Sequence, residues 1–169
     1  MPSARRRSAP LSLALMGTFA CAEPASPPAA APPAKAEPDP IVAAKPRLIA
    51  APETGDLAAI VREEAAREAG PLVVTVGAGW CEPCVAFHDA VKSGRLDQPL
   101  AGVRFLEFDI DRDKERLAAA GYKSRFIPLF ALPDAEGRAS GKQIQGGIKG
   151  PEAVEHIMAR LGPLLAETP

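Results

Sequence analysis

The hydrophobic and polar positions of the chain form two patterns that meet near residue 53. Before that point alanine and proline dominate, and 11 of the 19 prolines lie there. After it, apolar residues recur at helical spacing or gather in the short runs typical of strands. These patterns predict helices over residues 57–69, 81–94, 114–120 and 151–161, and strands over residues 72–76, 103–110, 127–132 and 142–145.

The boundaries of these elements carry their own signals. Asp56 is placed to cap the first helix, and Gly70-Pro71 ends it. The run over residues 72–76 is β-branched and does not alternate, which is typical of a strand covered on both faces. Residues 134–137 read as a hairpin turn, and Pro151 suits a first helical turn. This order predicts an α/β fold, a mixed central sheet flanked by helices on both faces.

The start of the chain has the layout of a secretory signal. Three arginines, Arg5 to Arg7, precede an apolar segment over residues 10–20, and Ala20-Cys21-Ala22 supplies small residues for a cut. The segment is about half of the ~20 residues that a membrane-spanning helix needs, which favours export. We expect a signal peptide over residues 1–21. Cleavage before Cys21 resembles processing of a bacterial lipoprotein, with Cys21 lipidated, and an ordinary cut after Ala22 is the alternative.

Composition divides the remainder. Residues 22–52, rich in alanine and proline, are expected to form a flexible tether because they offer too little apolar area to order the chain. Residues 53–169 are expected to form one folded domain, long enough to bury a core. In that part 18 acidic residues outnumber 14 basic ones without a basic cluster. Nucleic acid is therefore excluded as a partner.

Two cysteines follow the first strand in the sequence Gly79-Trp80-Cys81-Glu82-Pro83-Cys84. On a helix that begins near Cys81 the two thiols lie on one face about a turn apart, close enough to form a disulfide. The pair alone fits three kinds of chemistry: thiol–disulfide exchange, half of a metal site with His88 as a third ligand, or a structural disulfide. Haem attachment is excluded, because that motif needs histidine where Val85 stands.

This order of elements, with Trp-Cys-x-x-Cys after the first strand and Ile127-Pro128 at the start of the hairpin, resembles the thioredoxin-like family. The resemblance covers residues 53–165 and implies a thioredoxin fold. It implies that Cys81 is the exposed attacking thiol and Cys84 the buried resolving thiol. It also implies a cis bond at Ile127-Pro128 that packs against the disulfide.

The same resemblance implies that Trp80 contacts substrate and that Gly146 is the glycine after the last strand. Two further features, the acidic first helix and the sequence over residues 87–91, resemble exported members typified by the periplasmic domains of transmembrane disulfide reductases. The segment before Cys21 adds the resemblance to exported bacterial lipoproteins. His88, within residues 87–91, is expected on the surface of its helix.

The chain departs from the family beneath the disulfide. Thr75 stands where thioredoxins have a buried aspartate that assists proton transfer, and Glu107 aligns with a lysine that faces this aspartate. We expect Glu107 to take over proton transfer. The competing interpretation is an ordinary charged residue on the outer face of its strand. Leu129 follows Pro128 in place of the common threonine, which leaves the substrate preference open.

The chemistry of the motif favours a reductase. The attacking species is a thiolate, which the positive end of a helix stabilises at Cys81. Pro83 stiffens the first helical turn. The negative charge of Glu82 disfavours the adjacent thiolate, and a less stable thiolate means a more reducing couple. We expect a protein-disulfide reductase with no metal and no cofactor beyond the Cys81–Cys84 disulfide.

The expected surroundings follow from the signal segment. Client proteins with disulfides, a membrane-embedded electron donor and the membrane itself, through the lipid anchor, are the expected partners of a monomer in the periplasm or cell envelope. A different class remains open: a module on the same fold that delivers metal or assists assembly without catalysis.

Overall fold

The computed structural model describes residues 44–167. The predicted signal peptide, Cys21 and the tether as far as residue 43 lie outside these residues. The described part runs through the following elements in order: β1 (Arg47–Ala50), α1 (Leu57–Arg67), β2 (Leu72–Gly77), α2 (Glu82–Lys92), β3 (Arg104–Asp109), α3 (Ile110–Ala119), β4 (Leu129–Pro133), β5 (Ala139–Gln145) and α4 (Ala153–Ala166).

The strands form one mixed sheet in the order β1-β3-β2-β4-β5. β1, β3 and β2 run parallel, while β4 is antiparallel to β2 and β5 is antiparallel to β4. β2 therefore lies in the middle of the sheet, which explains why its residues 72–76 are all buried. The unalternated apolar run predicted this position.

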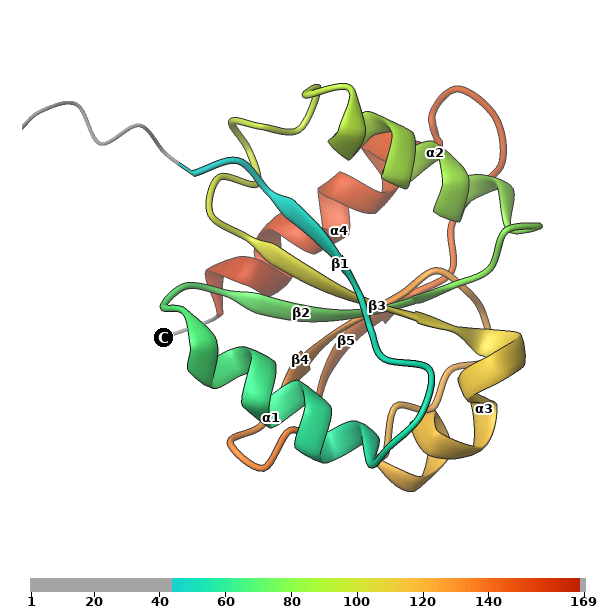
Figure 1. The fold of residues 1–169 in the computed structure, drawn as a ribbon. Helices are drawn as coiled ribbons and strands as arrows, with labels where there is room; N and C mark the ends of the chain where they lie inside the picture. The colour runs from blue at the N-terminus through green and yellow to red at the C-terminus, as the bar shows by residue number, and fades with distance from the viewer. Residues whose placement is uncertain (1–43, 168–169) are drawn as a thin grey trace, which may run out of the picture. The chain divides into compact units, whose positions relative to one another are not determined.

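Helices cover the sheet on both faces, with α1 and α3 on one side and α2 and α4 on the other (Figure 1). On the first side Leu57, Val61 and Leu117 pack against the sheet, and on the second Phe87 and Ile157 do so. Each helix presents the apolar stripe that its spacing predicted. The predicted fold class, an α/β sandwich with a thioredoxin-type mixed sheet, is confirmed.

The start of the folded part is a correction to the prediction. The tether was expected to reach residue 52, yet β1 pairs in register with β3, from Arg47 opposite Arg104 to Ala50 opposite Glu107. After the strand, the Ala51 amide donates to the Glu107 carbonyl at 3.0 Å. β1 is a four-residue edge strand between two prolines, so the composition around it hides its apolar centre. The sheet begins at residue 47.

Several boundaries also differ from the prediction. α3 begins at Ile110, four residues early, because the Asp109 carboxylate accepts from the backbone amides of Asp111 and Arg112 and caps the helix. β4 begins at Leu129, after the cis bond between Ile127 and Pro128. Asp56 caps α1 as predicted, accepting from the Ala59 amide at 2.8 Å.

The hairpin turn between β4 and β5 is confirmed. The Asp134 carboxylate accepts from the amides of Glu136 and Arg138, and the Gly137 amide donates to the Asp134 carbonyl at 3.1 Å. Gly137 has a φ of +79°, and a Cβ there would overlap the carbonyl of Ala58 in α1. The turn thus packs on a helix and requires glycine.

Among the helices of the described part, none is both long and apolar enough to cross a membrane.

Candidate active site

Cys81 and Cys84 form a disulfide at the start of α2, with their Cα atoms 5.2 Å apart. β2 ends at Gly77, a short turn follows, and Cys81 is the N-cap residue of the helix. Its side chain makes no capping hydrogen bond. The first backbone amides of α2 therefore have no side-chain acceptor from the N-cap. Pro83 lies in the first turn, as predicted.

Packing beneath α2 fixes where the disulfide lies. Phe87, which is 3% exposed, contacts Phe105 and Phe130 edge to face, with ring centroids 5.4 Å and 4.8 Å apart. Such pairs stabilise by ~0.5–1.5 kcal/mol beyond the burial of their area. The aromatic cluster attaches the first half of α2 to β3 and β4. It thereby holds the disulfide at the carboxyl end of β2.

The relative exposure of the two cysteines is a correction. The resemblance implied an exposed Cys81 and a buried Cys84, but in this disulfide form Cys81 is 5% exposed and Cys84 is half-buried. The reason is a cavity of about 420 Å³ that opens beside Cys84. Gly77 forms part of its wall, and a Cβ at that position would lie 3.3 Å from the Cys84 Cβ.

Trp80 lies beside the disulfide with 70% of its surface exposed. Its indole Nε1 donates to Oδ2 of Asp111 at 2.7 Å. Asp111 belongs to the first turn of α3, so a single hydrogen bond connects the residue before Cys81 to a different helix. The exposed ring is thereby held in one place. Asp111 was not predicted, because an acidic residue in a first helical turn is common and signals no distant partner.

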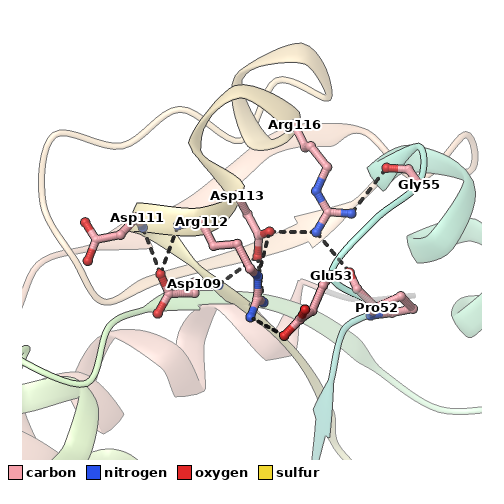
Figure 2. A network of polar contacts seen from close by, with 8 residues as sticks. All are labelled: Pro52, Glu53, Gly55, Asp109, Asp111, Arg112, Asp113 and Arg116. Atoms are coloured by element: carbon pink, nitrogen blue, oxygen red, sulfur yellow. Dashed lines mark hydrogen bonds and ion pairs between the residues drawn. The ribbon is translucent and has the colours of Figure 1, made fainter.

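A buried charge network fixes the start of α3 (Figure 2). Asp113 is fully buried and accepts hydrogen bonds from Arg112, from Arg116 at 2.6 Å and from the Asp109 amide at 2.9 Å. Burial raises the pKa of Asp113, but these hydrogen bonds outweigh it and hold that pKa below its ordinary value of 3.8.

The two arginines extend this network to the loop before α1. Arg112 pairs with Glu53 at 3.5 Å, and Arg116 donates to the carbonyls of Pro52 and Gly55 at 2.9 Å and 3.2 Å (Figure 2). The helix that carries Asp111 is therefore anchored to the chain that leaves β1. Trp80 depends on this anchorage through its bond to Asp111.

The bond between Ile127 and Pro128 is cis, as predicted, and Pro128 lines the cavity beside Cys84. The Gly146 amide donates to the Pro128 carbonyl at 2.8 Å. At Gly147 a Cβ would lie 2.9 Å from the Pro83 Cβ and 3.6 Å from the Pro128 Cδ. Three segments therefore meet beside the disulfide: the cis bond, the first turn of α2 and the chain after β5. This close approach requires glycine at position 147.

Glu82 is exposed, and its carboxylate accepts from the Gly150 amide at 2.8 Å. This bond joins the first turn of α2 to the loop before α4. The negative charge of Glu82 has one backbone amide as a partner in the described structure.

Thr75 and Glu107 are neighbours beneath the disulfide. They are register partners on β2 and β3, and both line the cavity with Cys84. The Thr75 hydroxyl is buried and has no hydrogen-bond partner in the described part of the chain. Burial raises the pKa of Glu107, and the charges of His88 and Lys92 oppose this rise without cancelling it. Glu107 thus lines a cavity. The competing interpretation, an ordinary charged residue on the outer face of its strand, does not describe this position.

His88 was expected on the helix surface, and its side chain is instead only 33% exposed and lines the same cavity. Its Nε2 lies 3.6 Å from Oε2 of Glu107. The sequence did carry a signal: His88 follows Cys84 by four residues, so the two share one face of a helix. Within residues 44–167 no three His, Cys, Asp or Glu side chains gather as a metal-ion cluster would require.

A second cavity of about 460 Å³ is lined by Ile127, the first residue of the cis bond. Trp80 and Phe126 also line it, together with basic groups of Arg125 and Arg160. Phe126 is 62% exposed, unusual for so large an apolar side chain. The sequence analysis did not single out Phe126, because it adjoins the apolar run that follows. Its position directly before Ile127-Pro128 was the available signal.

A cysteine pair bonded as a disulfide at the start of a helix, beside a cis-proline loop on an α/β sandwich, defines a thiol–disulfide oxidoreductase. No model of a known protein family matches the chain. Thioredoxin Asp f 28 of Aspergillus fumigatus is 37% identical over 84 residues, which are 50% of this chain and 73% of that protein. The chain belongs to the thioredoxin family.

Other comparisons give weaker likenesses. Thioredoxin Asp f 29 of Aspergillus fumigatus is 27% identical over 73 residues, 43% of this chain and 64% of that protein. Among solved structures, a mutant thioredoxin from Halobacterium salinarum NRC-1 has a TM-score of 0.40 at 16% identity, covering 74% of this chain and 95% of its own. A chloroplastic thioredoxin z has a TM-score of 0.37 at 20% identity, covering 60% and 83%.

Proposed function

We propose that this protein reduces disulfides of client proteins in the cell envelope, with Cys81 as the attacking thiol and Cys84 as the resolving thiol. The observation that carries the proposal is the Cys81–Cys84 disulfide at the start of α2, where the N-cap makes no side-chain hydrogen bond. The amides and the dipole of α2 stabilise a thiolate at that end of the helix.

The reduced protein acts in two steps. The Cys81 thiolate attacks one sulfur of a client disulfide, forming a mixed disulfide and leaving the electron pair on the other client sulfur. Cys84, as a thiolate, then attacks the Cys81 sulfur. The Cys81–Cys84 bond forms, the bond to the client breaks, and the client leaves as a dithiol. Two electrons pass from the protein to the client, and a partner must restore them.

The direction of electron flow rests on Glu82. Its carboxylate lies in the first turn of α2, one residue from Cys81, and counteracts the helix dipole there. A thiolate stabilised less makes the disulfide harder to reduce, so the reduced protein donates electrons more readily. We expect a reduction potential near the ~−270 mV of a reducing dithiol, and a value near ~−120 mV would reverse the assignment to an oxidant.

The place of action rests on the signal-like start of the chain, Arg5 to Arg7 followed by an apolar segment and Cys21. An exported reductase with a lipidated Cys21 would stay at a membrane surface, where a membrane-embedded donor can return it to the dithiol form. Expression of the full chain in a bacterium grown with a labelled fatty acid tests this. The label should enter the chain and be absent from a Cys21→Ala variant, whereas unlabelled, cytoplasmic protein would overturn the localisation.

Reduction of insulin disulfides by the full chain tests the activity. With a small-molecule dithiol as electron source, the wild-type chain should accelerate insulin precipitation. A Cys81→Ser variant should be inactive because it lacks the attacking thiol, and a Cys84→Ser variant should accumulate a mixed disulfide with insulin. A chain that is inactive at every dithiol concentration, and that binds a metal ion tightly at one equivalent, would replace the proposal with a metal-delivery module.

A further inference from the structure

The cavity beside Cys84 contains polar groups that the two thiol steps leave unused. Thr75, His88 and Glu107 line it together with Cys84, and its volume of about 420 Å³ has room for several water molecules. A cavity that reaches the resolving cysteine can serve the one step in which that cysteine must lose a proton. Hydroxyl groups such as that of Thr75 are poor bases, so the candidates are the carboxylate and the imidazole.

The backbone places these two groups toward Cys84 from different elements. His88 follows Cys84 by one helical turn on α2, which puts the two side chains on the same face. Glu107 lies on β3 opposite Thr75, two residues before the end of β2. Across the cavity, Nε2 of His88 and Oε2 of Glu107 are 3.6 Å apart. The contact holds the carboxylate between the sheet and α2.

The charges around Glu107 leave it able to accept a proton. Its side chain is 30% exposed, and burial raises its pKa, bringing it closer to that of a thiol. From α2, His88 and Lys92 oppose the rise. Asp109 and Arg112 line the cavity where β3 passes into α3. From β1, β2 and β4 the lining residues are uncharged, and so is Pro128 just before β4: Ala50, Thr75, Gly77 and Phe130.

We propose that Glu107, positioned by His88, is the base that deprotonates Cys84 when it resolves the mixed disulfide. The proposal rests on the two-step function above and concerns its second step. The proton leaves the Cys84 thiol for the Glu107 carboxylate, directly or through cavity water. The resulting thiolate attacks Cys81, and the electron pair departs with the client sulfur. Glu107 then releases the proton to solvent along the open side of the cavity.

A chromogenic aromatic disulfide separates the two steps in a rapid-mixing experiment. Attack by Cys81 on the reagent releases one coloured thiol at a rate that rises with reagent concentration. Resolution by Cys84 releases the second at a rate independent of concentration. Cys84→Ser should show the first phase alone. The full chain is fully reduced beforehand, and both phases are recorded across a pH series.

In the wild-type chain the rate of the second phase should rise with pH through the pKa of Glu107, because only the ionised carboxylate accepts the proton. Glu107→Gln should slow this phase about 10²-fold at neutral pH, the low end of the ~10²–10⁴-fold range for a general base, and remove that rise. The first phase should stay within twofold of wild type. Glu115→Gln, an exposed glutamate on α3, is the matched control and should change neither phase.

His88→Gln tests the positioning role. The interactions of His88 lower the pKa of Glu107, so their loss should raise that pKa further. The rise of the second phase should then move to higher pH while its plateau is largely kept. A second phase within twofold of wild type in Glu107→Gln, at every pH, would overturn the proposal and leave the reductase function intact. A wild-type chain without any concentration-independent phase would instead overturn the dithiol function itself.

Discussion

Asp113→Asn should cost the protein about 3 kcal/mol of its free energy of unfolding. Asp113 is fully buried and its two oxygens accept four hydrogen bonds: two from Arg112, both at 3.1 Å, one from Arg116 at 2.6 Å and one from the Asp109 amide at 2.9 Å. Asparagine has the same shape but a single acceptor oxygen. Its NH₂ group would take the place of the second oxygen, where it cannot accept the two hydrogen bonds that this oxygen now accepts, and its own N–H groups would face those donors.

The magnitude follows from the loss of two of the four bonds. Hydrogen bonds to a charged group contribute ~1.5–3 kcal/mol each, and removing one partner of a buried ion pair costs ~3–5 kcal/mol. The side chains of Arg112 and Arg116 are 41% and 19% exposed. They can therefore turn toward water, which favours the low end, about 3 kcal/mol. For a domain of this size the melting temperature should fall by roughly 10 °C.

Urea unfolding followed by far-ultraviolet circular dichroism measures the loss, which corresponds to a midpoint lower by roughly 1.5–2 M. Asp89→Asn, an exposed aspartate on α2, is the matched control and should stay within ~0.5 kcal/mol of wild type. The pKa of Asp113 is lower in the folded protein than its ordinary 3.8, so its contribution is complete above pH 3.8 and is lost as the pH falls through the folded value. The gap between wild type and variant should narrow there. A loss below 1 kcal/mol at neutral pH, or a gap that widens in acid, would refute the reasoning.

Two further substitutions test the turn and the tryptophan. In urea unfolding, Gly137→Ala should destabilise the protein by at least ~2 kcal/mol more than Gly141→Ala. Both glycines have a positive φ, but only at Gly137 would a Cβ meet the backbone of α1. Equal losses in the two variants would contradict the contact between the turn and α1. Asp111→Ala removes the acceptor of the Trp80 indole, so the fluorescence anisotropy of Trp80 should fall and insulin reduction should slow several-fold, while the unfolding free energy changes by ~1 kcal/mol or less. An unchanged anisotropy and rate would show that the bond does not position Trp80.

The parts predicted best from the sequence were those in which local pattern and tertiary environment agree. The run over residues 72–76 is apolar because β2 is central, and Asp56 and the turn over residues 134–137 act through bonds to their own neighbours. The strand β1 was not predicted, because an edge strand of four residues between prolines is recognisable only by its pairing with β3. α3 was placed late because its cap, Asp109, also ends a strand.

The site divides along the same line. The cysteine pair and the cis bond were found because their signals are contiguous in sequence. The contacts of Trp80 with Asp111 and of Glu107 with His88 span 31 and 19 residues, and neither charge pattern announces its partner. The exposure of Cys84 was missed for another reason, since it depends on a cavity whose lining comes from every strand but β5.

The bond between Trp80 and Asp111 has a practical consequence. Trp80 is the one tryptophan in the chain, it directly precedes Cys81, and its indole is held at one acceptor. All tryptophan fluorescence of the protein therefore originates beside the disulfide. Because a disulfide quenches a nearby indole more strongly than two thiols do, reduction should brighten the emission. The unlabelled protein thus contains an optical gauge of its own redox state, suited to measuring its potential and following electron transfer from a donor in real time.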